Sequence, residues 1–249
     1  MHEKRVVVVT GGASGIGLGI SRLFAANGHP VAVLDMQGEA LERETALLRD
    51  GGATVSAHKV DVSDRAQIDA AYDSIRAAFG PITIVIANAG ISIPVPFEDI
   101  SAEQWQRTID INLNGVFHTV QAAMPDMLAA KWGRVVTISS QAAQSGSQDR
   151  AHYAASKGGV IGLTRSLARE FGGRGITVNT IPPSLVDTPM AREGERSGQV
   201  PPLEVIAQHI PVPRPGTPSD IAHACEFLCS EKASYITGQE INVNGGSWM

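Results

Sequence analysis

Short runs of β-branched residues alternate with longer helical stretches along almost the whole chain, and this alternation limits the possible folds more than any other feature. Such a pattern is typical of a parallel sheet whose strands are joined by crossover helices. Valine and isoleucine occupy successive positions in most runs, so both faces of the sheet should be covered by helices. We therefore expect a Rossmann-type, doubly wound α/β fold with a parallel sheet of about seven strands.

The elements follow one another without an internal repeat or a dividing linker, so we expect a single domain over residues 1–249. The expected strands are Arg5–Thr10, Val31–Asp35, Thr54–Lys59, Ile82–Ala87, Arg134–Ser139, Thr177–Ile181 and Glu240–Val243. The expected helices cover about 15–28, 38–50, 64–79, 101–130, 151–172 and 219–230.

The segment 187–218 departs from this alternation, because it holds seven prolines among glycines and charged residues. It follows the sixth expected strand, at the carboxyl edge where open α/β sheets bind ligands. A long irregular insertion at such a place is usually functional. We interpret it as a substrate lid, and a disordered surface excursion is the alternative.

Composition excludes several classes of partner. The formal charge of −5 gives no electrostatic footprint for nucleic acid or an anionic membrane. The longest apolar runs are too short to span a bilayer, and the start of the chain lacks a targeting segment, so a cytoplasmic location is expected.

Cys225 and Cys229 stand four apart without other nearby ligands, so we expect no metal site and interpret them as small buried hydrophobic residues.

A glycine-rich loop, Thr10–Gly17, follows the first expected strand and opens the first helix. Glycines there allow a tight turn and let backbone N–H groups approach a pyrophosphate at the positive end of the helix. Asp35 ends the second strand, where an acid can accept hydrogen bonds from ribose hydroxyls and repel a 2′-phosphate. Lysine and arginine are absent from 10–21 and from 31–38, which favours NAD over NADP.

Tyr153 and Lys157 stand four apart at the start of an expected helix, so they share one face of it. A phenol has a reference pKa near 10, and a neighbouring ammonium favours the phenolate. Taken alone, such a pair is more often a surface pair. Its position after a glycine loop, an acid at the second strand and a Ser-Ser at the fifth makes coincidence a poor explanation.

With these residues in place, the whole chain resembles the short-chain dehydrogenase/reductase family. The family's T-G-x-x-x-G-x-G motif corresponds to Thr10–Gly17, its adenine contact to Asp61-Val62 and its N-A-G element to Asn88-Ala89-Gly90. The resemblance implies cofactor contacts from Gly11, Ser14, Gly15, Ile16, Gly17, Asp35, Asp61, Val62, Asn88, Ala89, Gly90, Tyr153, Lys157, Pro182 and Thr188.

The resemblance also implies a catalytic set of four residues. Tyr153 would act as general acid/base, and Lys157 would lower its pKa and bind the nicotinamide ribose. Ser140 would hydrogen-bond the substrate oxygen as an oxyanion donor. Asn112 would hold a water that connects Lys157 to solvent.

Further expectations concern the pocket and the assembly. Gln144 and Ser147 should line the substrate site together with Ser140 and Tyr153, because their loop must cross it. The family usually has Pro-Gly after the sixth strand, whereas this chain has Pro182-Pro183, which changes the local path into the lid.

Three glycines, Gly158, Gly159 and Gly162, cost about 1 kcal/mol each in a helix interior. Close packing of another backbone would explain them. In the family this helix forms a dimer interface and the segment 238–249 helps to build a tetramer, so the resemblance implies a homotetramer. A contact within one chain is the alternative.

The leading hypothesis is an NAD(H)-dependent oxidoreductase that interconverts a secondary alcohol and a ketone, both small molecules. The alternative within enzymes is a reductase of 3-oxoacyl thioesters on acyl-carrier protein or coenzyme A, since 166–179 and 235–246 are very similar to that subfamily. A non-catalytic NAD-binding regulator is a remote alternative, because all four catalytic residues are present.

Overall fold

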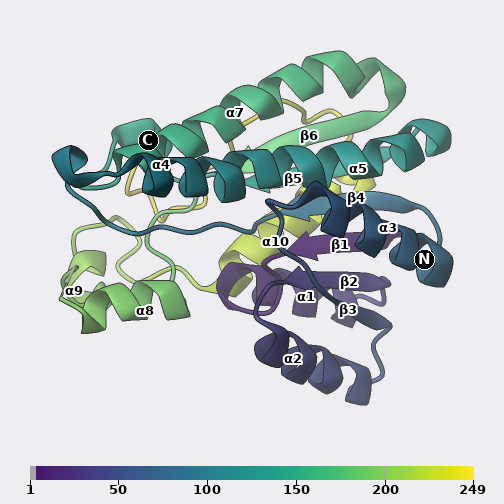
Figure 1. The fold of residues 1–249 in the computed structure, drawn as a ribbon, viewed down its shortest axis with the longest axis horizontal. Coiled ribbons are helices and arrows are strands. Elements are labelled where there is room, and N and C mark those ends of the chain that lie inside the picture. The colour runs from purple at the N-terminus through teal and green to yellow at the C-terminus, as the bar shows by residue number, and fades with distance from the viewer. Residues whose placement is uncertain (1–3, 199) are drawn as a thin grey trace.

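The computed structural model describes residues 4–198 and 200–249, so residues 1–3 of the expected domain and Gln199 of the expected lid lie outside the described residues. Six parallel strands form one sheet in the order β3-β2-β1-β4-β5-β6 (Figure 1). The strands are β1 (Val6–Thr10), β2 (Val31–Asp35), β3 (Val55–Lys59), β4 (Ile82–Ala87), β5 (Gly133–Ile138) and β6 (Ile176–Ile181). The order reverses direction between β1 and β4, which makes this the switch point where doubly wound sheets bind nucleotides.

Helices cover both faces of the sheet, as the continuous apolar runs predict. One face carries α1 (Gly15–Ala26), α2 (Gly38–Asp50) and α10 (Pro218–Cys229). The other carries α3 (Arg65–Phe79), α5 (Gly115–Ala130) and α7 (Ala151–Phe171). The shorter elements are η1 (Phe97–Asp99), α6 (Ala142–Ser145), η3 (Gly172–Arg174) and η4 (Glu231–Ala233).

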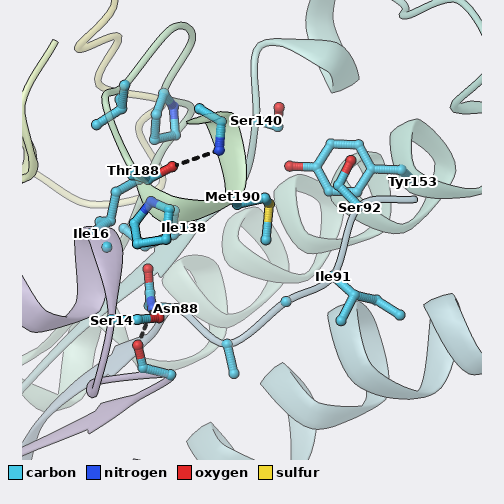
Figure 2. Close-up of a pocket in the computed structure, with 18 of the residues that line it drawn as sticks. Ser14, Ile16, Asn88, Ile91, Ser92, Ile138, Ser140, Tyr153, Thr188 and Met190 are labelled. Atoms are coloured by element: carbon cyan, nitrogen blue, oxygen red, sulfur yellow. Dashed lines mark hydrogen bonds between the residues drawn. The ribbon is translucent and has the colours of Figure 1, made fainter. Parts of the chain in front are cut away.

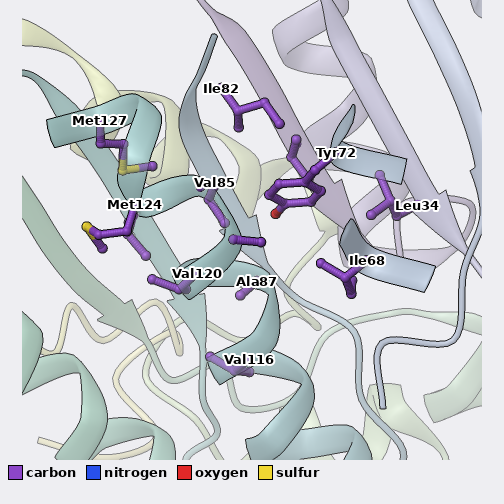
Figure 3. Close-up of a cluster of buried hydrophobic side chains, with 14 of the residues drawn as sticks. Leu34, Ile68, Tyr72, Ile82, Val85, Ala87, Val116, Val120, Met124 and Met127 are labelled. Atoms are coloured by element: carbon purple, nitrogen blue, oxygen red, sulfur yellow. The ribbon is translucent and has the colours of Figure 1, made fainter. Parts of the chain in front are cut away.

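Successive residues of β1 enter two separate hydrophobic clusters, because side chains alternate across a strand. Val6 and Val8 pack with α3, α5 and α7, and Val7 and Val9 pack with α1, α2 and α10. Figure 3 shows the first cluster, where Tyr72 of α3 lies among side chains of the sheet and of α5. The Tyr72 hydroxyl donates to the Thr119 carbonyl oxygen at 2.8 Å, which satisfies the one polar atom of this fully buried ring.

The expected seventh strand, Glu240–Val243, does not form. Only an isolated bridge joins Glu240 to Thr180 of β6. The segment runs along β6, but the N–H of Val178 donates to the Thr237 hydroxyl and the side chain of Asn179 accepts from the N–H of Gln239. Three backbone hydrogen bonds join Gly238, Gln239 and Ile241 to β6, and the side chains of Thr237 and Asn179 take two further positions, so the pairing is only partial.

The stretch expected as one helix, 101–130, is interrupted. It consists of α4 (Ala102–Ile109), a π-helical turn η2 (Asp110–Asn114) and α5. Such π turns within helices occur frequently at functional sites. Here the turn holds the buried Asn112, whose contacts are described below.

The segment 187–218 is more regular than its prolines suggest. It contains α8 (Pro189–Arg196) and α9 (Leu203–Ala207), which lie close together at one end of the molecule (Figure 1). Arg192 of α8 forms ion pairs with Asp187, Glu195 and Glu204, and so connects both helices to the end of the preceding loop. No helix within the described residues is long and apolar enough to cross a membrane.

Candidate active site

A cavity of about 470 Å³ lies at the carboxyl ends of the strands, between the glycine loop, α7 and the segment with α8 and α9. It brings together most of the site residues expected from the sequence. Those that line it are Gly11, Ser14, Gly15, Ile16, Asp35, Asp61, Val62, Asn88, Ala89, Gly90, Ser140, Ser147, Tyr153, Lys157 and Thr188. Figure 2 shows Ser14, Ile16 and Asn88 on one side of the cavity and Tyr153 and Ser92 on another.

The glycine loop presents the positive end of α1 to the cavity. Ser14 precedes the helix in an extended conformation but makes no capping hydrogen bond, and the first turn holds no acidic residue. The first N–H groups of a helix lack intrahelical partners and carry partial positive charge. Ser14, Gly15 and Ile16 line the cavity at this point, so the loop fits the pyrophosphate of a dinucleotide.

Close backbone contacts explain why this loop needs glycine. Gly11 has a φ of +61°, in the left-handed region. A Cβ at Gly17 would lie 2.1 Å from the Gly11 carbonyl oxygen and 2.6 Å from the Asn88 side-chain nitrogen. Gly17 lies outside the cavity lining. Its lack of a side chain lets α1 start directly against the loop.

The N-A-G element fastens the end of β4 to the glycine loop. The Asn88 side chain donates to the carbonyl oxygens of Thr10 at 3.0 Å and Gly11 at 3.1 Å. The N–H groups of Asn88 and Ala89 both donate to the Thr10 hydroxyl. These bonds cross the switch point and fix the loop that would hold the cofactor.

Two acidic residues line the cavity at the side of β2 and β3. Asp35 accepts hydrogen bonds from the N–H groups of Ala13, at 3.1 Å, and Gln37, at 3.0 Å. Each carboxylate oxygen keeps further acceptor capacity for a ligand. Asp61 accepts from the N–H and the hydroxyl of Ser63. This end of the cavity therefore offers oxygen acceptors, which suit the hydroxyl and amino groups of an adenosine.

Tyr153 and Ser140 form the other end of the cavity. Burial raises the pKa of the Tyr153 phenol, and the Ser140 hydroxyl and the charge of Arg150 oppose that rise. The Ser140 oxygen accepts from the N–H of Ala142 at 3.2 Å, which leaves its own proton available for a ligand oxygen. The arrangement combines a protonated phenol with a hydroxyl donor in one space.

Lys157 lies one helical turn beyond Tyr153, with its ammonium 5.9 Å from the centre of the tyrosine ring. The ammonium donates to the carbonyl oxygen of Ile138, at the end of β5, at 2.8 Å. Burial lowers the pKa of Lys157 to about 8. The ammonium therefore titrates closer to neutral pH than a surface lysine.

Asn112 lies behind the cavity, and its side chain connects three segments. Its oxygen accepts from the N–H of Ile91 at 2.8 Å, and its nitrogen donates to the Ile91 carbonyl oxygen and to the Ser156 hydroxyl. The side chain is fully buried and does not line the cavity. Its amide joins the π turn to α7, next to Lys157.

Two other expected residues lie away from the cavity lining. The amide nitrogen of Gln144 donates to Glu240 and Asn242 of the C-terminal segment. Pro182 is buried, and its neighbour Pro183 lines the cavity in its place. The Pro183 carbonyl oxygen accepts from the N–H of Gln141, so this second proline keeps a backbone connection to the loop after β5.

Several lining residues were not expected from the sequence. Ile91 and Ser92 follow the N-A-G element, and Met190 belongs to α8. Arg150 precedes α7 and lines the cavity three residues before Tyr153. That short spacing was the available signal for Arg150, but the path of the loop before α7 decides which way its side chain points.

Comparisons with known proteins agree with this geometry. A family model described as Enoyl-(Acyl carrier protein) reductase matches residues 11–247. The D-threitol dehydrogenase of Mycolicibacterium smegmatis is 38% identical over 98% of this chain and 93% of its own length. The 3-oxoacyl-(acyl-carrier-protein) reductase of Escherichia coli is 36% identical over 99% of this chain and 98% of its own.

Solved structures give the same result. Levodione reductase superimposes with a TM-score of 0.92 and 34% identity, covering 97% of this chain and 96% of its own. A variant of actinorhodin polyketide ketoreductase solved with NADPH superimposes with a TM-score of 0.93 and 31% identity, covering 98% of both chains. At this identity and coverage, the chain belongs to the short-chain dehydrogenase/reductase family, and it is an oxidoreductase that acts on CH–OH groups with a nicotinamide cofactor.

Proposed function

We propose that this protein is an NAD(H)-dependent oxidoreductase that interconverts a small secondary alcohol and its ketone. The observation that carries the proposal is the shared cavity, which Asp35, the glycine loop, Ser140, Tyr153 and Lys157 all line. A nicotinamide ring, when bound, supplies the hydride acceptor or donor. The residues of the chain supply orientation and proton transfer.

Tyr153 is the general acid/base of the proposed reaction. During ketone reduction its phenol donates a proton to the substrate oxygen, and its raised pKa keeps that proton available at neutral pH. During alcohol oxidation the phenolate accepts the proton. Ser140 donates a hydrogen bond to the same oxygen and stabilises the charge that develops there.

Lys157 and Asn112 support the proton transfer. The ammonium of Lys157 binds the nicotinamide ribose and favours the phenolate of Tyr153 by its charge. Asn112 fixes the segment beside Lys157, where a water could relay protons to solvent. Both roles come from the family resemblance, and the buried position of the two side chains supports them.

NAD is the proposed cofactor because Asp35 lines the adenosine end of the cavity. A 2′-phosphate beside this carboxylate would meet repulsion. Lys59 of β3 stands in register with Asp35, but it is exposed and outside the cavity lining. The contacts proposed for the nicotinamide end are those of Pro182, Pro183 and Thr188.

We also propose that 187–218 acts as the substrate lid and that four chains assemble into a tetramer in the cytoplasm. Thr188 caps α8 by accepting from the N–H of Ala191, and both residues line the cavity. The start of α8 is thus fixed beside the site, and the rest of the segment can close over a substrate.

A reductase of 3-oxoacyl thioesters is the second candidate function. The similarity to the Escherichia coli reductase favours it, since it extends over nearly the full length of both chains. Asp35 argues against the NADPH that most such reductases use. The cofactor preference and the substrate class together separate the two candidates.

The test follows absorbance at 340 nm with purified protein. We expect turnover of secondary alcohols with NAD, and Tyr153→Phe should lose about 10²–10⁴-fold in kcat/KM because the proton donor is gone. Asp35→Asn should shift the kcat/KM ratio toward NADP by about tenfold or more, a free-energy change of ~1.4 kcal/mol. Glu39→Gln is the matched control, since Glu39 is an exposed acid four residues further along.

Two outcomes would contradict the proposal. Faster reduction of a 3-oxoacyl thioester with NADPH would favour the second candidate. Turnover that persists in Tyr153→Phe would remove the tyrosine from the mechanism. If neither reaction occurs, a cofactor titration separates a binding protein from an enzyme with an untested substrate.

A further inference from the structure

Arg150 is a cation at the cavity wall whose guanidinium makes no hydrogen bond within the described residues. Its Nε atom is buried without a hydrogen-bond partner, and none of the described carboxylates forms an ion pair with it. A buried donor without a partner is costly, and more so when it is charged. Arg150 lines the cavity with Tyr153, so a ligand there could supply the missing partner.

The loop before α7 holds Arg150 in place. Asp149 adopts a left-handed conformation with a φ of +56°, which is uncommon outside glycine. The Asp149 carbonyl oxygen accepts from the N–H of Val95 at 2.7 Å, which ties this loop to the segment after β4. Arg150 is the next residue and stands at the start of α7. The backbone is therefore constrained on one side by this bond and on the other by the helix.

The charges around the cavity are unevenly distributed. Its lining holds four ionisable groups besides Tyr153, namely Asp35 and Asp61 as acids and Arg150 and Lys157 as bases. The acids follow β2 and β3, and β1 and β4 separate them from β5 and Ser140. Lys157 already donates to Ile138. The end of the cavity with Tyr153 and Ser140 thus presents two cations. Of these, Arg150 is the one whose side chain makes no hydrogen bond within the described residues.

Apolar groups form much of the remaining wall at this end. Ile91 follows β4, Ala142 begins α6, and Met190, Leu203 and Ile206 come from the lid. A charge placed against such groups is poorly solvated, so a guanidinium there interacts more strongly with an anion than it would at the surface. A planar guanidinium also matches carboxylate and phosphate oxygens with two parallel hydrogen bonds.

We propose that the substrate carries an anionic group, carboxylate or phosphate, which Arg150 binds while Tyr153 and Ser140 hold the reacting oxygen. The inference rests on the proposed alcohol–ketone chemistry and names its substrate class. Arg150 acts as a specificity residue: it orients the substrate and discriminates against neutral analogues. The charge of Arg150 also lowers the pKa of the Tyr153 phenol. Arg150 would therefore act on the proton donor as well as on the anionic group of the substrate.

The first test compares matched ketones. Acetoacetate is paired with its methyl ester, and dihydroxyacetone phosphate with dihydroxyacetone, so the two anions are tested separately. We expect kcat/KM for at least one anion to exceed that for its neutral partner by tenfold or more. Arg150→Gln should lower this ratio about 10- to 100-fold, mainly through KM, because a charged hydrogen bond is lost. Arg150→Lys should recover part of it.

Arg169→Gln is the matched control, since Arg169 lies exposed on the same helix and outside the cavity lining. It should leave the ratio unchanged. Equal kcat/KM for charged and neutral ketones in the unaltered protein would overturn the proposal. So would a preference for anions that Arg150→Gln leaves intact, because another group would then be responsible.

A binding measurement separates this inference from the proposed function. Tyr153→Phe protein loaded with NADH is titrated calorimetrically with acetoacetate and with dihydroxyacetone phosphate, and the titration is repeated with Tyr153→Phe/Arg150→Gln. Anion binding that depends on Arg150, without turnover of any ketone by the unaltered protein, would support the anion site and contradict the catalytic proposal. Turnover of neutral ketones without Arg150-dependent anion binding would contradict the anion site and support the catalytic proposal.

Discussion

Burial affects the two central ionisable groups in opposite directions. It raises the pKa of the Tyr153 phenol and lowers that of the Lys157 ammonium to about 8, since the charged form of each loses solvation. Both shifts disfavour the ion pair of phenolate and ammonium. The groups that oppose the shift at Tyr153 are Ser140 and Arg150. Proton transfer at this site therefore depends on hydroxyl and guanidinium neighbours as well as on the tyrosine–lysine pair.

The lowered pKa of Lys157 predicts how stability changes with pH. The unfolded chain, with a lysine pKa of 10.5, binds more protons between pH 8 and 10.5 than the folded chain does. The free energy of unfolding contributed by this group must therefore rise with pH through that window, and the full cost of burying the charge is present below pH 8. Between about pH 7.5 and pH 9.5 the expected gain is roughly 2 kcal/mol.

Urea unfolding of the protein and of Lys157→Met at several pH values checks this. The free energy of unfolding of the unaltered protein should rise with pH relative to that of Lys157→Met, because methionine does not titrate. Lys232→Met, at an exposed lysine of η4, is the control and should follow the unaltered protein. A constant difference across the window would mean that Lys157 keeps an ordinary pKa.

The site residues differ in how well the sequence predicts them. The glycine loop and Asp35 could be placed because each lies at the junction of a strand and a helix, where local sequence sets the geometry. Gln144 and Arg150 lie between β5 and α7, where the path of the chain depends on contacts with distant segments. Gln144, expected at the substrate site, contacts the C-terminal segment, and Arg150, which was not expected there, lines the cavity.

Among the elements, the expected lid is held together mainly by one side chain. Arg192 donates to both carboxylate oxygens of Asp187, at 2.8 and 2.7 Å, and also pairs with Glu204 and Glu195. Its side chain is 35% exposed, so each single pair contributes little to global stability. Together they join α8 to α9, whose first residue, Leu203, is fully buried.

We predict that Arg192→Met loosens the lid without unfolding the protein. Three carboxylates would remain close together without their common cation, so α8 and α9 should separate more readily. The KM for substrate should rise several-fold, while the free energy of unfolding changes little, because solvent-exposed ion pairs contribute little to stability. Steady-state kinetics and limited proteolysis within 190–215 measure the two effects.

Arg196→Met is the comparison, because Arg196 lies on the same helix and pairs only with the exposed Glu193 among the described residues. It should change neither KM nor the proteolysis rate. Unaltered KM and proteolysis in Arg192→Met would show that the ion pairs of Arg192 do not hold the segment in place.

The elements that the sequence misplaces share one cause. Five strands of the sheet are predicted because each is a fully buried run rich in β-branched residues. The sixth, β3, is only partly buried, and its place follows from the alternation of strands and helices around it. Side-chain hydrogen bonds to distant backbone act at both places: the Thr237 hydroxyl accepts from the N–H of Val178 beside the segment 240–243, and the Asn112 oxygen accepts from the N–H of Ile91 at the π turn. Such bonds depend on the completed fold, and the pattern of apolar residues does not contain them.

At the scale of the whole molecule, the glycines of α7 divide into two kinds. A Cβ at Gly159 would lie 2.8 Å from the Leu113 side chain, so this glycine is needed for packing within the chain. A Cβ at Gly158 or Gly162 would meet nothing within 4 Å. Neither of these two is required by the single chain, although each weakens the helix by about 1 kcal/mol relative to alanine. A partner helix that approaches this face closely would explain both, and Phe117 of α5 is a further large apolar residue left 43% exposed.

We therefore predict that Gly162→Leu breaks the proposed tetramer while the chain stays folded. A Cβ at this position meets nothing within 4 Å on the single chain, whereas a leucine side chain would prevent close approach of a second backbone. Sedimentation velocity should give the mass of four 26.2 kDa chains for the unaltered protein and a smaller species for the variant.

Ala78→Leu, on the exposed side of α3, controls for adding the same side chain elsewhere and should keep the larger mass. If Gly162→Leu also sediments as a tetramer, α7 does not form the interface, and the glycines need another explanation. If the unaltered protein sediments as one chain, the site must be complete without a partner, and the kinetic tests above then describe a monomer.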